Sequence, residues 1–181
     1  MSDSLYFLGI DPGNNLGISL LEIDPSNLNI LGISTHRYIL DRHIDHDEQI
    51  MLSKWFVIED IVAHIANTYQ PYVVAMEAAF LNVRYPNAII TLGSYTTILE
   101  KSLSTFLRHN RIFKYPPKYV KKTLGDGNAD KEDMMINVGA IKEISDKIDT
   151  RLLSEHEVDA TAIAYTALLE VRKYPYILYS L

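Results

Sequence analysis

Two acidic residues lie directly at the ends of apolar segments, where a charged side chain is unfavourable if the segment is buried. Asp11 follows the apolar run 5–10, and Glu77 follows the apolar run 72–76. Both runs are short and continuous, which predicts buried β-strands. A carboxylate at the end of a buried strand is costly unless a partner such as a metal ion compensates its charge. A strand-end cap or a salt bridge is the alternative for either acid alone, but two acids on matching strand ends favour a shared site.

A second set of candidate ligands begins the segment 156–164. His156 and Asp159 are three residues apart, so on a helix they share one face. The small alanines that follow allow a helix to lie close to a sheet, which would bring Asp159 near the strand ends. The alternative, an acidic helix start, explains Glu155 and Glu157 well but explains Asp159 poorly. Carboxylate oxygens with one imidazole suit Mg²⁺ or Mn²⁺ better than a structural zinc.

This ligand set predicts phosphoryl-transfer chemistry. Two divalent ions ~3.5–4 Å apart can hold the attacking and leaving oxygens of an in-line displacement at phosphorus. The chain has no G-x-x-x-x-G-K-[ST] phosphate loop, and a Ser or Cys nucleophile has no comparable support. The sequence therefore predicts a metal-dependent nuclease site.

The elements that would position these residues follow from hydrophobic periodicity and turn residues. Strands are predicted at 5–11, 16–23, 29–39, 72–76 and 111–115. Helices are predicted at 49–69, 87–108, 118–124, 131–144 and 154–172, with loops at 41–48 and 125–128. Asp130 and Ser154 are candidate N-caps of the last two helices. Three strands, followed by strands that alternate with helices, predict an α/β fold with a mixed sheet.

Composition limits the classes of protein. The 181 residues suffice for one domain, and we expect a single domain spanning 1–181. Hydrophobic residues make up 48% and charged residues 22%, which is ordinary for a globular protein. No apolar run reaches the roughly 18 residues that a membrane helix needs. A signal peptide has basic residues before its apolar stretch, and none precedes the first apolar run here. Because the chain has no cysteine, it can form neither disulfides nor thiolate metal sites, which fits the cytoplasm.

The basic residues gather in one window of the sequence. The net charge of −6 opposes nucleic-acid binding, but the distribution matters more than the sum. Between residues 101 and 122 no acid interrupts Lys101, Arg108, Arg111, Lys114, Lys118, Lys121 and Lys122. Tyr115 and Tyr119 interleave with these cations, which suits phosphate contacts with some base stacking. A solvated face is the alternative.

Four segments of the chain together resemble the RuvC-type Holliday-junction resolvases of the ribonuclease H-like superfamily. They are GIDPGNNLG at 9–17, VVAMEAAF at 73–80, VKKTLGDGNADKEDM at 120–134 and HEVDATAIA at 156–164. Each segment alone is a weak signal, but the four in this order span nearly the whole chain. The resemblance implies a ribonuclease H-like fold, with a mixed five-stranded sheet and helices on both faces.

The resemblance also implies site residues and partners. It assigns catalysis and metal binding to Asp11, Glu77, His156 and Asp159, with two Mg²⁺ or Mn²⁺ ions, and stacking on DNA bases to Phe80. Together with the basic window, it leads us to expect DNA contacts at Phe80, Arg84, Lys118, Lys121, Lys122 and Lys131. The implied substrate is branched DNA, such as a four-way junction, in which a homodimer makes two symmetrical cuts. Helix 87–108 is expected to form the dimer interface.

The chain also departs from the family pattern. Leu16 precedes Gly17 where the family has a Thr, and Ala78 replaces a common Gln after the acid. These departures favour a divergent form, such as one carried by a phage or mobile element and acting in the host cytoplasm. Three alternatives remain: a related nuclease acting on structured RNA, a catalytically inactive junction-binding module, and an actin-like ATPase. The last needs two lobes, and 181 residues hold one.

Overall fold

The computed structural model describes residues 4–40, 50–78, 86–107 and 111–178, and its centre is a single five-stranded sheet. The strands lie in the order β3-β2-β1-β4-β5. Their bounds are β1 Leu5–Asp11, β2 Asn15–Ile23, β3 Ile30–Ile39, β4 Val73–Glu77 and β5 Arg111–Tyr115. The first three strands pair antiparallel, whereas β4 runs parallel to both β1 and β5. The prediction of a mixed five-stranded sheet is therefore confirmed.

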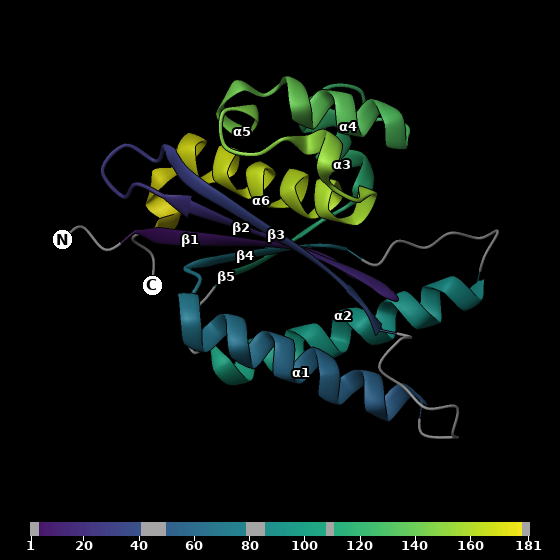
Figure 1. The fold of residues 1–181 in the computed structure, drawn as a ribbon. Coiled ribbons are helices and arrows are strands. Elements are labelled where there is room, and N and C mark those ends of the chain that lie inside the picture. The colour runs from purple at the N-terminus through teal and green to yellow at the C-terminus, as the bar shows by residue number, and fades with distance from the viewer. Residues whose placement is uncertain (1–3, 41–49, 79–85, 108–110, 179–181) are drawn as a thin grey trace.

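Helices cover both faces of this sheet (Figure 1), as predicted. One face carries α1 (Ile50–Tyr69) and α2 (Pro86–Phe106). The other face carries α6 (Glu155–Lys173), with α3, α4 and α5 packed beyond and beside it. Those three helices span Pro117–Leu124, Lys131–Ala140 and Lys142–Ser145, and short 3₁₀ turns lie at η2 Thr150–Leu152 and η3 Pro175–Leu178. Each face has its own hydrophobic core, because successive strand residues point to opposite faces.

The predicted helix 131–144 is interrupted in the structure. α4 ends at Ala140, and Ile141 is extended, with φ −74° and ψ 108°, before the short α5 begins. The break lets Ile144 turn into the core, where it is fully buried. η2 packs on the end of α4 so closely that a Cβ on Gly139 would lie 2.7 Å from the Thr150 Oγ1 atom. The apolar pattern continues through the break, so periodicity alone could not reveal it.

Both predicted N-caps are present. The Asp130 side chain accepts a hydrogen bond from the Asp133 amide at 3.0 Å, and the Asp133 side chain accepts one from the Asp130 amide. Ser154 and Glu157 form the same reciprocal arrangement at the start of α6. The caps fix where α6 begins, and this start carries the candidate ligands.

Within the described residues, no helix combines the length and apolar character needed to cross a membrane.

Candidate active site

The acidic ends of β1 and β4 lie side by side. The two strands are parallel neighbours with Ile10 opposite Met76, so Asp11 and Glu77 come next at the same edge of the sheet. Phe7 and Ala75, at odd positions of these strands, lie in the core under α6. Because side chains alternate along a strand, Asp11 and Glu77 point to that same face. The prediction that the two acids meet at one sheet edge is confirmed by this register.

Two glycines allow α6 to lie directly on the strands. A Cβ added to Gly9 would lie 2.1 Å from the Ala160 carbonyl oxygen, and one added to Gly17 would lie 2.1 Å from the His156 carbonyl oxygen. No side chain fits at either place, so glycine is required for this close approach. The alanines of α6 are fully buried against the sheet, as the sequence predicted. The approach brings the first turn of α6 over the end of β1.

His156 is hydrogen-bonded to the first acid. Its Nδ1 atom donates to Asp11 Oδ2 at 2.7 Å, and the two side chains are only 24% and 14% exposed. The other ring nitrogen, Nε2, lies 3.5 Å from Glu155 Oε1. Glu155 in turn forms an ion pair with Lys131 Nζ at 2.5 Å. A row of ionisable side chains in contact therefore runs from the surface to Asp11. Lys131 and His156 were predicted as site residues from the sequence, whereas Glu155 was interpreted as part of an acidic helix start. Only the fold shows that Glu155 links Lys131 to His156.

The three carboxylates perturb one another. Burial, together with the negative charges of Asp11 and Asp159, raises the pKa of Glu77 to about 7. Burial and the charge of Asp11 raise the pKa of Asp159 to about 6. Burial also raises the pKa of Asp11, although the hydrogen bond from His156 opposes this. The same hydrogen bond raises the pKa of His156. Crowded, partly buried carboxylates of this kind favour a bound cation.

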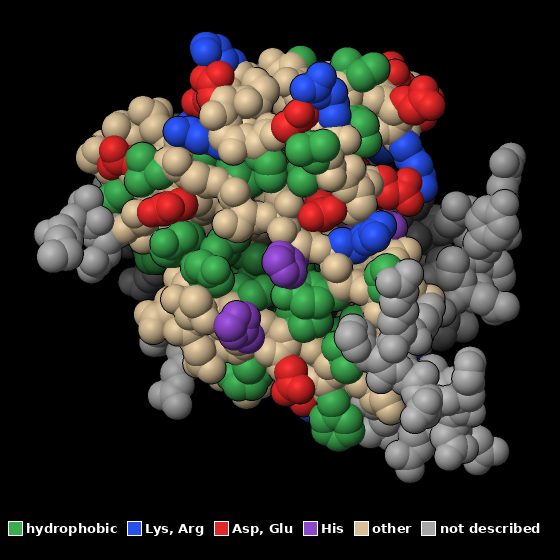
Figure 2. Space-filling view, viewed as in Figure 1, with side chains coloured by type: hydrophobic (Ala, Val, Ile, Leu, Met, Phe, Trp, Pro, Cys, Tyr) green, Lys and Arg blue, Asp and Glu red, His purple; other side chains and the backbone are tan. Residues whose placement is uncertain are grey.

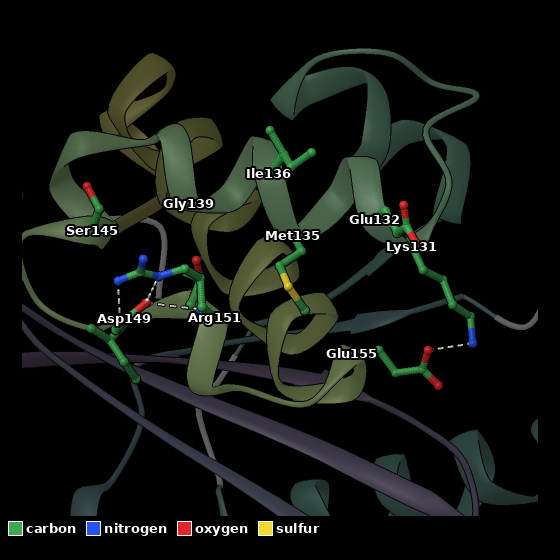
Figure 3. Close-up of a pocket in the computed structure, with 11 residues that line it drawn as sticks. Lys131, Glu132, Met135, Ile136, Gly139, Ser145, Asp149, Arg151 and Glu155 are labelled. Atoms are coloured by element: carbon green, nitrogen blue, oxygen red, sulfur yellow. Dashed lines mark hydrogen bonds and ion pairs between the residues drawn. The ribbon is translucent and has the colours of Figure 1, made fainter.

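A small pocket opens between the acids. Glu77 and Asp159 line a hollow of about 40 Å³ together with Lys121 and apolar side chains of α3, α4 and α6. A larger pocket of about 760 Å³ lies between α4, α5 and η2, and the ion-paired Lys131 and Glu155 are among its lining residues (Figure 3). It contains none of the three clustered carboxylates, so the candidate chemistry belongs to the small pocket.

The donor atoms fit a hard divalent cation. Among the residues that the structure describes, no three His, Asp or Glu side chains are arranged as a group that could hold a metal ion. However, three carboxylates with raised pKa values and one imidazole converge on the same sheet edge. Oxygen-rich sites of this composition suit Mg²⁺ or Mn²⁺. A cation would also offset the burial and the repulsion that raise these pKa values.

The basic window of the sequence is divided in space. Lys101 and Lys114 pair with the acids Glu59 and Glu100, at 3.8 Å and 2.5 Å. Lys101 lies on α2, across the sheet from α3, so it shares no surface with the cations of that helix. The window is therefore not one continuous basic surface.

The cations of α3 lie nearer the acids. Lys121 borders the small pocket and donates to the Ala129 carbonyl oxygen at 2.6 Å. Lys118 and Lys122 flank the loop at Gly127. The remaining predicted DNA-binding residues, Phe80 and Arg84, lie outside the described residues. On the face shown in Figure 2, Lys and Arg side chains are interspersed with acids, and its described part shows no large basic patch.

Comparison with known proteins agrees with this geometry. The chain is 26% identical over 166 residues to a crossover junction endodeoxyribonuclease RuvC of Orientia tsutsugamushi (strain Boryong), covering 90% of this chain and 94% of that protein. It is 27% identical over 172 residues to the RuvC of Rickettsia prowazekii (strain Madrid E), covering 94% and 100%. The fold matches Thermus thermophilus RuvC, solved in complex with a Holliday junction substrate, with a TM-score of 0.70, 20% identity and coverage of 94% and 97%.

A family model described as crossover junction endodeoxyribonuclease RuvC matches residues 7–167. The match contains both strand-end acids and the start of α6 with its two candidate ligands. It also spans the whole sheet from Phe7 onward, so the resemblance covers the scaffold as well as the site. The chain belongs to the RuvC family of crossover junction endodeoxyribonucleases.

Proposed function

We propose that this protein is a metal-dependent endonuclease that resolves Holliday junctions and other branched DNA by paired hydrolysis of phosphodiester bonds. Membership of the RuvC family supports the reaction and the substrate. The observation that carries the proposal is the convergence of Asp11, Glu77 and Asp159 at one sheet edge, each with a raised pKa. This arrangement has little value for stability and suits a cation.

In this proposal Asp11, Glu77 and Asp159 hold two divalent ions, Mg²⁺ or Mn²⁺, with His156 as a further ligand or as the group that positions the attacking water. The bound ions supply activation of water and stabilisation of charge on the phosphate. His156 keeps Asp11 in place through the hydrogen bond from Nδ1. Glu155, which is paired with Lys131, lies 3.5 Å from the other ring nitrogen of His156. Hydrolysis leaves 5′-phosphate and 3′-hydroxyl ends.

The same proposal assigns DNA binding to side chains around the acids. Lys118, Lys121 and Lys122 on α3 and Lys131 at the start of α4 supply positive charge for backbone phosphates. Phe80 and Arg84 follow the catalytic strand β4 in sequence and are assigned contacts with the branch point. Two symmetrical cuts require two sites, so we propose a homodimer formed through α2, in which the whole chain acts as one catalytic domain. We place its action in the cytoplasm, which is the host cytoplasm if the protein is carried by a phage.

The test is cleavage of a labelled, mobile four-way junction, compared with linear duplex and with a structured RNA of similar length. The proposal expects paired nicks in the junction with Mg²⁺ or Mn²⁺, no cleavage in EDTA, and little cleavage of duplex or RNA. Preferred cleavage of the RNA would show the related RNA-directed nuclease instead. Tight junction binding without cleavage under any divalent ion would show an inactive binding module.

A further inference from the structure

A polar cluster holds the tip of the β1–β2 hairpin, three residues beyond Asp11. The Asn14 side-chain oxygen accepts a hydrogen bond from Lys54 Nζ at 2.9 Å and another from the Tyr95 hydroxyl. Lys54 also donates to the Tyr95 oxygen at 3.2 Å. The Asn14 carbonyl oxygen accepts from the Leu40 amide at 2.8 Å. The hairpin tip is thus held from α1, from α2 and from the residue that follows β3.

The burial of this cluster is unusual for its chemistry. Lys54 is 7% exposed and Tyr95 is 2% exposed, and Tyr95 lies in the apolar core between the sheet, α1 and α2. Burying an ammonium group and a hydroxyl costs free energy unless both find partners. An apolar pair of similar volume would join α1 to α2 without that cost. What an apolar pair could not do is hold the side chain of Asn14.

The position of the hairpin matters for the acids. Asp11 pairs with Gly17 across the hairpin, and Gly17 lies directly against the backbone of His156. A displacement of the hairpin tip would therefore move Asp11 and disturb the contact between Gly17 and the first turn of α6. Neither Lys54 nor Tyr95 lines the small pocket between the acids. Their effect on the site would pass through Asn14 and the hairpin backbone.

We propose that Lys54, Tyr95 and Asn14 form a positioning cluster that fixes the β1–β2 hairpin, so that Asp11 is held ready for a divalent cation. The inference rests on the proposed function, because it assumes that Asp11 binds the cation. It goes beyond that function by assigning a role to three residues outside the acidic cluster. It also makes the helical face remote from the acids part of their support.

The first test measures the hairpin itself in the metal-free protein. Hydrogen–deuterium exchange of residues 11–17 is followed in EDTA for Tyr95→Phe and Asn14→Ala. Loss of a hydrogen bond should speed exchange there by roughly 3- to 10-fold. Asn14 is exposed, so its replacement leaves the core intact if Tyr95→Phe folds poorly. Asn14→Asp keeps an oxygen acceptor and should keep exchange near the wild-type rate.

The matched control is Tyr165→Phe. Tyr165 is 8% exposed and donates a hydrogen bond to Glu143 at 3.1 Å, but it lies in the other core, on α6. It should lose a similar amount of thermal stability without faster exchange in the hairpin. Equal exchange in the hairpin for Tyr95→Phe and wild type, or an equal increase for Tyr165→Phe, would overturn the proposal.

The second test measures Mn²⁺ binding by electron paramagnetic resonance. The Tyr95→Phe and Asn14→Ala variants should bind Mn²⁺ roughly 3- to 10-fold more weakly, the free-energy equivalent of one hydrogen bond, with unchanged affinity for the junction in EDTA. Wild-type affinity for Mn²⁺ in both variants would refute the positioning role. If wild type binds Mn²⁺ but does not cut junctions, the proposed function fails while the comparison of variants still decides this inference. If wild type binds no Mn²⁺, both are refuted.

Discussion

The two faces of the sheet are built from different side chains, although they share the same strands. Under α6, β1 presents Gly9 and then Asp11, and the helix meets it with alanines. On the opposite face, β1 presents the large residues Leu8 and Ile10, which pack with the side chains of α1 and α2. The first face brings backbones close together, whereas the second fills a wider space with bulky side chains.

This difference shows how the fold divides its work. The close face sets the distance between His156 and Asp11, because nothing larger than hydrogen fits between α6 and the hairpin at Gly17. The bulky face supplies most of the large fully buried side chains and holds the hairpin tip through Asn14. Changes to the close face should therefore alter both stability and chemistry. Changes to the other face should alter chemistry only through the hairpin.

The largest expected effect on the free energy of unfolding comes from replacing a glycine on the α6 side of the sheet, compared with a glycine on the α2 side. Gly9→Ala places a Cβ 2.1 Å from the Ala160 carbonyl oxygen, so α6 must shift. We expect a loss of about 3 kcal/mol in the free energy of unfolding, as for an overpacked core. Gly93→Ala on α2 meets no atom within 4 Å and should add roughly 0.5–1 kcal/mol through helix propensity. Urea denaturation measures both, and equal effects of the two substitutions would refute the contrast.

A second prediction concerns the charge on the close face in the absence of metal. Because the folded pKa of Glu77 is raised to about 7, the metal-free protein should lose stability as the pH rises from about 4.5 to about 7. Glu77→Gln should therefore be more stable than wild type in EDTA at pH 8, by on the order of 2 kcal/mol. The difference should vanish below pH 4.5, where Glu77 is protonated in both the folded and the unfolded state.

A carboxylate of opposite behaviour serves as the control. Glu143 has a lowered pKa because Arg172 binds it, so its charge stabilises the fold above its unfolded pKa. Glu143→Gln should lower the melting temperature at neutral pH, and this loss should fade as the pH falls through the lowered pKa. Destabilisation by both substitutions at pH 8 would contradict the assignment of Glu77 to a repulsive cluster.

The smallest expected effect separates the two parts of the basic window. Replacing Lys118 and Lys122 with Ala should weaken junction binding and flatten its salt dependence, by up to about 0.9 in slope for each phosphate that is no longer neutralised. Lys101 and Lys114 pair with acids of α1 and α2, on the face of the sheet away from the proposed catalytic carboxylates, so replacing them should leave the slope unchanged. Lys121 is left in place because it also holds the Ala129 carbonyl oxygen. Fluorescence anisotropy at several salt concentrations measures both variants, and equal slopes would refute the division.

Local patterns were enough to predict much of the close face. The apolar runs that end on Asp11 and Glu77, the alternation of strands with helices, and the alanines after Asp159 together placed the acids at one sheet edge. The caps at Asp130 and Ser154 were predictable because capping depends on residues three positions apart. These features are short-range, and the parallel neighbourhood of β1 and β4 follows from a common connection rule.

Features that depend on distant contacts could not be predicted. Residues 101–122 form one basic window in the sequence, but their acidic partners Glu59 and Glu100 lie on helices that only the fold brings near. The break after Ala140 depends on packing against η2. The burial of Lys54 could not be read from its helix, although a cation among apolar neighbours was a signal to examine. In each case the decisive contact joins residues far apart in the chain.

We propose that the carboxylates at the ends of β1 and β4 and on α6 form the metal-dependent nuclease site. The most direct test is cleavage of a labelled four-way junction by Asp11→Asn with Mg²⁺, with junction affinity measured in EDTA. The surface variant Asp146→Asn serves as the control. We expect no cleavage above background for Asp11→Asn, wild-type cleavage for the control, and wild-type junction affinity for both. Cleavage at the wild-type rate by folded Asp11→Asn would contradict the claim.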